Sequence, residues 1–366
     1  MAQVAAGKPV AIFVQGEYGI GKSSIAGFIQ KVAEYEHGLH GIYAPLGAAS
    51  SIEDVGAAIL EATVRSGALN SRRSEIVREW LSKYIGQQSF FGVTLHVDAL
   101  KKDAPAITSG ILPFLREVRD RLQDTGVKGI FLVLDEINGI TANSKFAHFI
   151  KGIVDTNALS REPLPLLLML CGVEERRREM IRQHQPTDRI FDVVEIAPLS
   201  GSETKEFFQK AFASAQMTIT EKALDLFATY SGGFPKIMHL IGDAAYWRDQ
   251  DGQVDDQDAY GALLVAAEEV GSKFVDQQVY KELKSPDYRA ILKVIGKSGL
   301  GMSFRRSDVV SGLTDAQKKK MGNFLQKMKK LGVIRSGENQ GEYVFTGRMA
   351  RLYIWLKSSE QNPAPH

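Results

Sequence analysis

The stretch GEYGIGKSSIAGF, residues 16–28, decides the fold of this chain. It follows an apolar run, PVAIFV, and leads into the helical pattern of SSIAGFIQKVAEY. The spacing G-x-x-x-x-G-K-[ST] is met by Gly16, Gly21, Lys22 and Ser23. Glycines let backbone N–H groups turn toward an anion, and the start of a helix attracts the same anion through its dipole. The stretch therefore predicts a phosphate-binding loop between a strand and a helix.

The side chains of this loop have expected roles. Lys22 would reach the β- and γ-phosphates of a nucleoside triphosphate, and the Ser23 hydroxyl would bind Mg²⁺. Gly19 and Ser24 would complete the binding of the phosphates. The alternative is a glycine-rich turn without a ligand, but the strand before it and the helix after it favour nucleotide binding. We therefore expect ATP or ADP, together with Mg²⁺, as the cofactors.

A second polar motif ends another apolar run. Residues 127–136 read VKGIFLVLDE, a pattern typical of a strand that is buried on both faces of a parallel sheet. At the sheet edge beside the phosphate loop, Asp135 would hold Mg²⁺, usually through water, and Glu136 would polarise the attacking water. The alternative is a strand that ends in a charged turn. Together the two motifs predict hydrolysis of ATP to ADP and phosphate, which we expect to be slow and stimulated by a partner.

These motifs resemble those of a known family. GEYGIGKS resembles a Walker A motif and FLVLDE a Walker B motif, and the order of the later features resembles the AAA+ and related STAND ATPases. In that family a polar sensor residue often ends the next core strand, for which PLPLLLMLCG, residues 163–172, is the candidate here. Cys171 and Gly172 stand at that place, so the chain departs from the family pattern there.

The resemblance implies two further basic residues. Arg189 precedes the expected strand FDVVEIAPL, where the family's arginine finger is commonly found, and would reach the γ-phosphate bound by a neighbouring subunit. GGFPKIMHLIG resembles the sensor 2 region, in which Lys236 would contact the phosphates. The alternatives are a surface arginine at a helix end and a lysine that only begins a helix. The family also implies a homo-oligomer, as a ring or a helical assembly.

The chain divides into four expected parts. They are a P-loop ATPase core over residues 1–200, a helical lid over 201–275, a winged helix-turn-helix over 276–357 and a disordered tail over 358–366. Lys22 and Asp135 are 113 positions apart, which is more than the core elements between them need. We therefore expect an insert near residues 65–105, with a helix and a short β segment, that contacts a partner or covers the sheet edge.

Charge is distributed unevenly along the chain. The formal net charge is only +2, but residues 281–357 hold 17 Lys and Arg against 6 Asp and Glu. Residues 1–280 hold 28 basic and 36 acidic residues. This asymmetry indicates that the C-terminal part meets a polyanion; the alternative is a solvated basic surface without a partner.

The pattern of the basic part resembles a winged helix-turn-helix. SPDYRAILKVIGKSG, FRRSDVVSGL and DAQKKKMGNFLQKMKKLGVI are expected to form three helices, and GVIRSGENQGEYVF a β-hairpin. In this fold the third helix commonly enters the major groove, so Lys318, Lys319, Lys320 and Lys327 would contact the phosphates of double-stranded DNA. The alternative is a winged helix that docks a protein partner. The following RMARLYIWLK is expected to pack against the module.

The overall composition limits the classes of protein to which this chain can belong. No apolar run reaches the roughly 18 residues that a membrane span requires, so no membrane partner is expected. The N-terminal stretch lacks the basic start of a secretory signal. The single cysteine, Cys171, excludes an internal disulfide and fits the reducing cytoplasm, where we expect the protein.

The fold class that follows is α/β: a P-loop NTPase parallel sheet flanked by helices, then a helical lid and a winged helix-turn-helix. The whole resembles the origin-recognition and replication-initiator branch of AAA+ and the archaeal-type STAND ATPases. The first functional hypothesis is a DNA-associated switch ATPase, compatible with replication initiation, helicase loading or regulation of transposition. The second is a STAND-type signalling or defence ATPase that docks a protein. A third, a scaffold that hydrolyses poorly, is disfavoured by Glu136.

Overall fold

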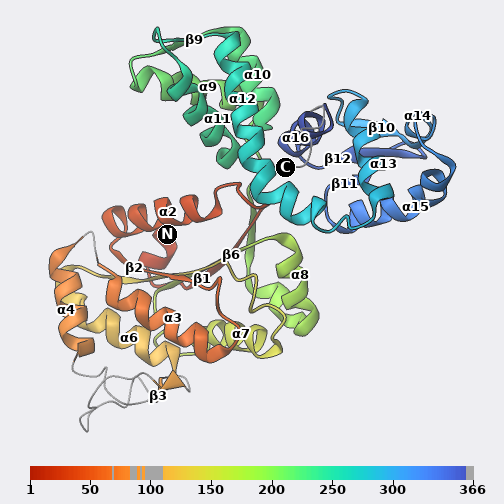
Figure 1. Ribbon diagram of the computed structural model, residues 1–366. Coiled ribbons are helices and arrows are strands. Elements are labelled where there is room, and N and C mark those ends of the chain that lie inside the picture. The colour runs from red at the N-terminus through yellow and green to blue at the C-terminus, as the bar shows by residue number, and fades with distance from the viewer. Residues whose placement is uncertain (68–69, 83–88, 91–92, 95–109, 360–366) are drawn as a thin grey trace. The chain divides into compact units, whose positions relative to one another are not determined.

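The computed structural model forms two compact units, Met1–Ala197 and Pro198–His366 (Figure 1). The residues that it describes are 1–67, 70–82, 89–90, 93–94 and 110–359.

The first unit is built on a parallel sheet. In the part of the chain that is described, five strands pair in the order β2-β5-β6-β1-β7. They are β1 (Val10–Gln15), β2 (Leu39–Pro45), β5 (Gly129–Asp135), β6 (Leu166–Gly172) and β7 (Asp192–Glu195). Val14 pairs with Cys171, and Leu170 pairs with Leu134, so β1, β6 and β5 end together. Their carboxyl ends therefore form one edge of the sheet, with β6 lying between the other two strands.

Helices cover both faces of this sheet (Figure 1). On one face α2 (Lys22–Glu36) packs through Ala26 and Ala33 against the strands. On the other face lie α3 (Ile52–Arg65), α6 (Ile111–Arg121), α7 (Ser144–Ala158) and α8 (Glu174–Gln183), which contribute to a larger core. Because both faces are covered, every residue of β5 and β6 is buried, as the apolar run of residues 127–136 predicts.

The expected insert is described in part. It contains a helix, α4 (Ser71–Ser82), and two short strands, β3 (Ser89–Phe90) and β4 (Val93–Thr94). Trp80 of α4 stacks on Phe114 of α6 with 5.8 Å between the ring centroids, so α4 belongs to the core of the unit. Residues 83–88, 91–92 and 95–109 lie outside the described part of the chain.

The second unit begins with a group of helices. They are α9 (Gly201–Ser214), α10 (Glu221–Ser231), α11 (Pro235–Arg248) and α12 (Asp256–Val270). Phe208, Phe212 and Phe227 pack together in their core. A capping box joins Ser200 and Glu203 at the start of α9, satisfying backbone N–H groups that the helix cannot pair itself. A π-helical segment, η3 (Gly271–Tyr280), continues directly from α12.

A mixed α/β module follows. Its helices are α13 (Pro286–Lys297), α14 (Arg306–Val310) and α15 (Asp315–Lys330), and its strands are β10 (Ser303–Arg305), β11 (Ile334–Ser336) and β12 (Glu342–Phe345). The strands pair antiparallel in the order β10-β12-β11. The expectation that FRRSDVVSGL is wholly helical is wrong at its start. Phe304 is buried in a strand that pairs with β12 and lies beside the Tyr343 ring, because the hairpin offers it both hydrogen bonds and an apolar contact.

The final helix, α16 (Arg348–Ser359), joins the two parts of this unit. Its Met349 and Leu352 belong to the core of α9–α12, while Tyr353 and Ile354 belong to the core of the module. Buried Arg351 donates to the carbonyl oxygens of Gly301 (3.1 Å) and Gly296 (3.3 Å), at the end of α13. The expectation that this helix packs against the module is therefore confirmed.

The close approach of β5 to the chain before β6 gives a prediction for stability. A Cβ at Gly129 would lie 2.4 Å from the carbonyl oxygen of Pro165, which is backbone and cannot move aside cheaply. We expect Gly129→Ala to lower the free energy of unfolding by about 1–3 kcal/mol. The measurement is urea denaturation of the full chain. Gly152→Ala is the control, since a Cβ there meets nothing within 4 Å in α7 and should stabilise by about 0.5–1 kcal/mol. Equal changes in the free energy of unfolding for Gly129→Ala and Gly152→Ala would contradict the packing argument.

Candidate nucleotide-binding site

The loop between β1 and α2 has the backbone that its glycines predict. Gly19 and Gly21 have φ values of 80° and 97°, in the left-handed region that glycine adopts without a steric penalty. Gly21 is the N-cap of α2, which begins at Lys22. A Cβ at Gly16 would lie 3.0 Å from the carbonyl oxygen of Ile196, so the loop packs closely against the chain that follows β7. The free N–H groups of the first turn of α2 therefore stand at the carboxyl edge of the sheet.

Lys22 lies across this loop. Its Nζ donates to the carbonyl oxygens of Gly16 (2.9 Å) and Glu17 (2.8 Å). Burial lowers the pKa of the Lys22 ammonium, while the nearby carboxylates of Asp135 and Glu136 oppose that shift. A partly desolvated cation gains most from an additional anion, so the loop has the electrostatics of a phosphate site.

Asp135 ends β5 and is almost fully buried, with 3% of its surface exposed. Its Oδ1 accepts a hydrogen bond from the backbone N–H of Glu136 (2.8 Å), and its Oδ2 accepts one from the hydroxyl of Tyr43. The Ser23 side chain lies near the same hydroxyl. Burial, then the hydrogen bond to Asp135, raise the pKa of Tyr43, so the phenol remains protonated. Tyr43 thus bonds one of the two residues predicted to hold the metal and lies near the other, and the sequence analysis missed it.

Glu136 stands next to this group but faces solvent. Its φ is 56°, a conformation that costs a glutamate free energy and is held by the surrounding structure. A Cβ at Gly47, in the loop between β2 and α3, would lie 2.5 Å from Oε2 of Glu136. Gly47 therefore leaves the space that the Glu136 carboxylate occupies. The local sequence GAASS gave no sign of this role.

The donor set at this edge suits Mg²⁺. The Ser23 hydroxyl and the Asp135 carboxylate are hard oxygen donors, and the Tyr43 hydroxyl bonds Asp135 and lies near Ser23. Within the described ranges no cluster of three or more His, Cys, Asp or Glu forms an all-protein metal site. Mg²⁺ commonly binds through one or two protein oxygens, nucleotide phosphates and water, so two ligands are sufficient here.

The end of β6 carries no ionised group. Cys171 is fully buried, and burial, then the Asp135 carboxylate, raise the pKa of its thiol to about 12. The thiol is therefore neutral near pH 7. At the neighbouring end of β1, Gln15 is buried and its Oε1 accepts from Nε of Arg177 (3.1 Å), which also pairs with Asp188 (2.7 Å). Gln15 and Arg177 are polar residues at this edge that the sequence analysis did not identify.

The two basic residues implied by the family resemblance lie in different units. Arg189 is exposed in the short helix η2 (Gln185–Ile190) of the first unit, directly before β7. Lys236 is exposed at the second position of α11 in the second unit. Their contacts with a nucleotide stay predictions.

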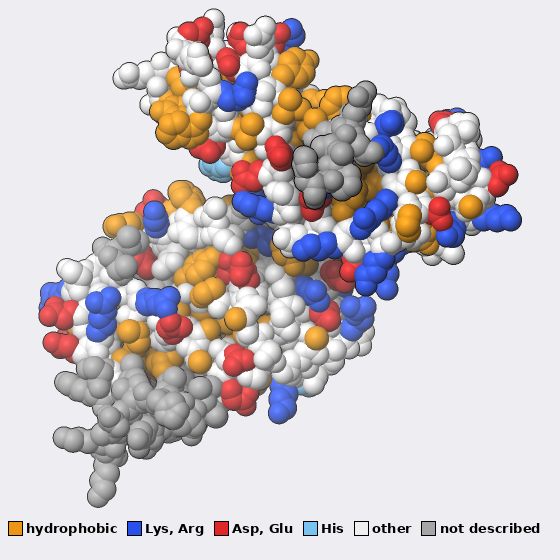
Figure 2. All heavy atoms as spheres, in the orientation of Figure 1, with side chains coloured by type: hydrophobic (Ala, Val, Ile, Leu, Met, Phe, Trp, Pro, Cys, Tyr) orange, Lys and Arg blue, Asp and Glu red, His pale blue; other side chains and the backbone are white. Residues whose placement is uncertain are grey.

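The basic helix α15 packs one side against the module, and several of its lysines are already paired. Met321, Phe324 and Met328 are buried on its inner side. Three of the predicted DNA-contacting lysines form exposed ion pairs. These are Lys318 with Asp315 (3.1 Å), Lys320 with Asp287 (2.6 Å) and Lys327 with Glu282 (3.2 Å). Lys319 is exposed as well. Figure 2 shows Lys and Arg side chains gathered over α13 and α15, yet part of this positive charge is compensated within the unit.

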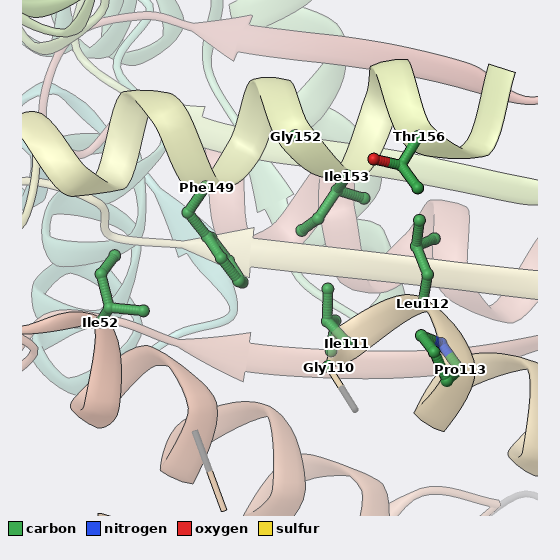
Figure 3. Close-up of a pocket in the computed structure, with 9 residues that line it drawn as sticks. All are labelled: Ile52, Gly110, Ile111, Leu112, Pro113, Phe149, Gly152, Ile153 and Thr156. Carbon is green, nitrogen blue, oxygen red and sulfur yellow. The ribbon is translucent and has the colours of Figure 1, made fainter. Parts of the chain in front are cut away.

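Among the described residues, pockets also lie away from this site, and two of them differ in their lining. One, of about 400 Å³, lies beside α15 and is lined by Ser285, Tyr288, Lys320, Asn323 and Lys327, among others. The other, of about 430 Å³, lies on the sheet face opposite α2 and is lined mainly by apolar side chains (Figure 3). They include Ile52 of α3, Ile111 and Leu112 of α6, and Phe149 and Ile153 of α7. The apolar lining of the second pocket does not suit a triphosphate.

The sheet, the glycine loop and the flanking helices define the P-loop NTPase fold, as the sequence predicts. The ORC2 protein of Aeropyrum pernix, solved with ADPNP and ADP, is similar in structure, with a TM-score of 0.59 at 13% identity over 97% of this chain and 88% of that one. The Walker-type ATPase of Pyrococcus abyssi gives 0.53 at 17% identity over 96% and 93%. At these identities the likeness is one of fold. Family models and curated proteins give no match to the sequence.

No helix among the described residues has the length and apolar character needed to cross a bilayer.

The space at Gly47 gives a prediction for the site. A methyl group there would overlap Oε2 of Glu136, and the flexible carboxylate would move aside. We expect Gly47→Ala to lower ATP turnover by about 10- to 100-fold, since misplacing a reacting group by about 1 Å has effects of this size. Nucleotide affinity should change less than about twofold, because the phosphate loop is untouched. Gly27→Ala in α2, where a Cβ meets nothing within 4 Å, is the control. Normal turnover by Gly47→Ala would contradict this role.

Proposed function

We propose that this protein binds Mg²⁺–ATP, hydrolyses it and works as a DNA-associated switch. The observation that carries the proposal is the convergence of Lys22, Ser23 and Asp135 at the carboxyl edge of the sheet. Lys22 lies near the Asp135 carboxylate, which the Tyr43 hydroxyl bonds, and Ser23 lies near the same hydroxyl. A cation, a helix start and a pair of metal-binding oxygens are the groups that bind a metal–triphosphate.

Each group has a role in hydrolysis. The N–H groups of the loop and Lys22 bind the β- and γ-phosphates and stabilise the charge that develops on them. Ser23 and Asp135 would hold Mg²⁺, which would neutralise charge on the phosphate oxygens. Glu136 accepts a proton from water as the water oxygen bonds to the γ-phosphorus. The bond from that phosphorus to the bridging oxygen breaks, and ADP and phosphate are the products.

Assembly into a homo-oligomer, a ring or a helical assembly, would complete the site. Arg189 is assigned to the γ-phosphate of a neighbouring subunit, which its exposure in η2 permits. Lys236 at the start of α11 is assigned to the phosphates in the nucleotide-bound state. Binding and hydrolysis of ATP would then shift the protein between two states of assembly.

The charge of the second unit supports a polyanion partner, for which we propose double-stranded DNA. The order α13, β10, α14, α15, β11 and β12, with its antiparallel sheet, supports a winged helix-turn-helix. Lys318, Lys319, Lys320 and Lys327 would contact phosphates. Their ion pairs oppose DNA binding only weakly, because exposed pairs contribute only about 0–1 kcal/mol and a phosphate can replace the carboxylate.

A STAND-type signalling or defence ATPase is the second candidate. The pairing of Lys320 with Asp287 and of Lys327 with Glu282 favours it, because internal compensation weakens the attraction for DNA. In that case the module would dock a protein rather than DNA.

Two substitutions separate binding from chemistry. Lys22→Ala removes the cation of the loop, so nucleotide binding should fall by at least about 100-fold, a loss of some 2.7 kcal/mol. Glu136→Gln keeps the metal-binding Asp135 but removes the proton acceptor, so affinity should persist while turnover falls by about 10²–10⁴-fold. Equilibrium binding of a fluorescent ADP and single-turnover hydrolysis measure the two effects. Undiminished turnover by Glu136→Gln would refute the assignment of the base.

The salt dependence of DNA binding tests the second unit. Binding that neutralises phosphates releases counterions, so log affinity falls linearly with log salt by about 0.9 for each phosphate. Alanine at Lys318, Lys319 and Lys320 together should weaken duplex binding and flatten that slope by up to about three. ATP hydrolysis without DNA should persist.

The control for this titration carries alanine at three exposed lysines of the first unit, Lys31, Lys128 and Lys145. It loses the same formal charge and should keep the parent slope if DNA binds the second unit. Identical slopes and affinities for the parent and the α15 variant would reject DNA as the ligand of this surface and favour protein docking.

A further inference from the structure

We propose that Tyr43 is a positioning residue of the metal-binding half of this site. Its hydroxyl holds the Asp135 carboxylate, beside Ser23, in the orientation that Mg²⁺ requires when it enters with a nucleotide. The inference rests on the proposed function and adds to it a residue from β2, a strand outside both nucleotide-binding motifs.

Strand register places Tyr43 at this site. Pro45 pairs with Asp135 and Tyr43 pairs with Val133 in the parallel ladder between β2 and β5. Side chains two residues apart along a strand lie on the same face, so Tyr43 and Asp135 share a face of the sheet. It is the face that α2 covers, and Tyr43 packs against the apolar cluster there. The phenol therefore reaches from β2 toward the end of β5 and the first turn of α2.

The Asp135 carboxylate is fixed at both oxygens. The Glu136 N–H binds Oδ1, and the Tyr43 hydroxyl binds Oδ2. A carboxylate held at one oxygen rotates about its Cβ–Cγ bond, whereas two donors fix its plane. Only 3% of the Asp135 surface is exposed. Bulk water therefore has little access to the carboxylate and cannot readily replace a hydrogen-bond donor that is removed. Each oxygen keeps a lone pair for a metal ion or for water bound to it.

Ser23 lies beside the same phenol. It stands in the first turn of α2, near enough to the Tyr43 hydroxyl to oppose the rise that burial causes in the pKa of the phenol, whereas Asp135 ends a strand far along the chain. The Tyr43 hydroxyl is therefore close to both expected metal ligands and bonds one of them. Mg²⁺ demands near-ideal octahedral geometry, and loss of an outer-shell partner typically costs about 10- to 100-fold in metal affinity.

The test uses the full-length chain with Tyr43→Phe, which removes one oxygen and keeps the ring. The affinity for ADP is measured in EDTA and in Mg²⁺, and the ratio of the two is the gain due to metal. We expect the affinity in EDTA to change less than about twofold and the gain to fall about 10-fold. The affinity of Mn²⁺ for the ADP-bound protein, followed by electron paramagnetic resonance, should fall to the same extent. Tyr35→Phe, at a tyrosine of α2 that is 70% exposed, is the control.

The outcomes separate this inference from the proposed function. If the parent protein binds no ADP, or binds it without any gain from Mg²⁺, the proposed function fails. If the parent shows the gain and Tyr43→Phe keeps it, Tyr43 has no positioning role. A larger gain in Tyr43→Phe would also overturn the inference, because the phenol would then compete with the metal.

A double-substitution cycle provides a second, independent test. If Tyr43 acts partly through Ser23, the effects of Tyr43→Phe and Ser23→Ala on the metal gain should be less than additive, since the two side chains would then act on the same metal ion as a unit. Additive effects would show that the two side chains act separately and would reject this joint action. Thermal unfolding of each variant shows whether a loss of binding reflects a loss of fold.

Discussion

The parallel pairing of β5, β6 and β1 is the constraint on which the rest of the first unit depends. Because Leu134 pairs with Leu170, and Cys171 pairs with Val14, the three strands stop at one edge of the sheet. Backbone hydrogen bonds are satisfied inside the sheet up to that edge, and polar groups are tolerated only where the strands end. Asp135 and the glycine loop therefore meet there, although 113 positions separate Lys22 from Asp135.

Burial at this edge of the sheet determines the electrostatic properties of the site. Lys22 is partly desolvated beside the carboxylates of Asp135 and Glu136, and Cys171 stays a neutral thiol in the same apolar surroundings. A buried carboxylate is stable only when its oxygens are bonded, which the N–H of Glu136 and the hydroxyl of Tyr43 achieve. The N–H of Glu136 and the hydroxyl of Tyr43 hydrogen-bond the Asp135 carboxylate when no ligand is present. In our proposal the same two donors orient the carboxylate toward a metal ion.

The second unit shows a different balance between packing and charge. Helix α16 contributes side chains to both of its cores, and a Cβ at Gly271 would lie 2.1 Å from the Tyr353 ring, so η3 and α16 are in close contact. Around this packed framework, Asp287 and Glu282 pair with Lys320 and Lys327 of α15. The sequence shows the excess of basic residues in the second unit. Only the structure shows how many of these residues form ion pairs with acidic side chains.

The sequence by itself determined the features that arise from residues close together in the chain. The glycine loop, the buried strand that ends at Asp135 and the inner face of α15 follow from local spacing, because backbone freedom and helical or strand periodicity act over a few residues. Only the tertiary structure decided that Tyr43 bonds Asp135 across 92 positions and that Gly47 makes room for Glu136. It also decided that Phe304 joins a strand instead of a helix. These contacts depend on strand register and on the packing of distant segments, which no local pattern of residues encodes.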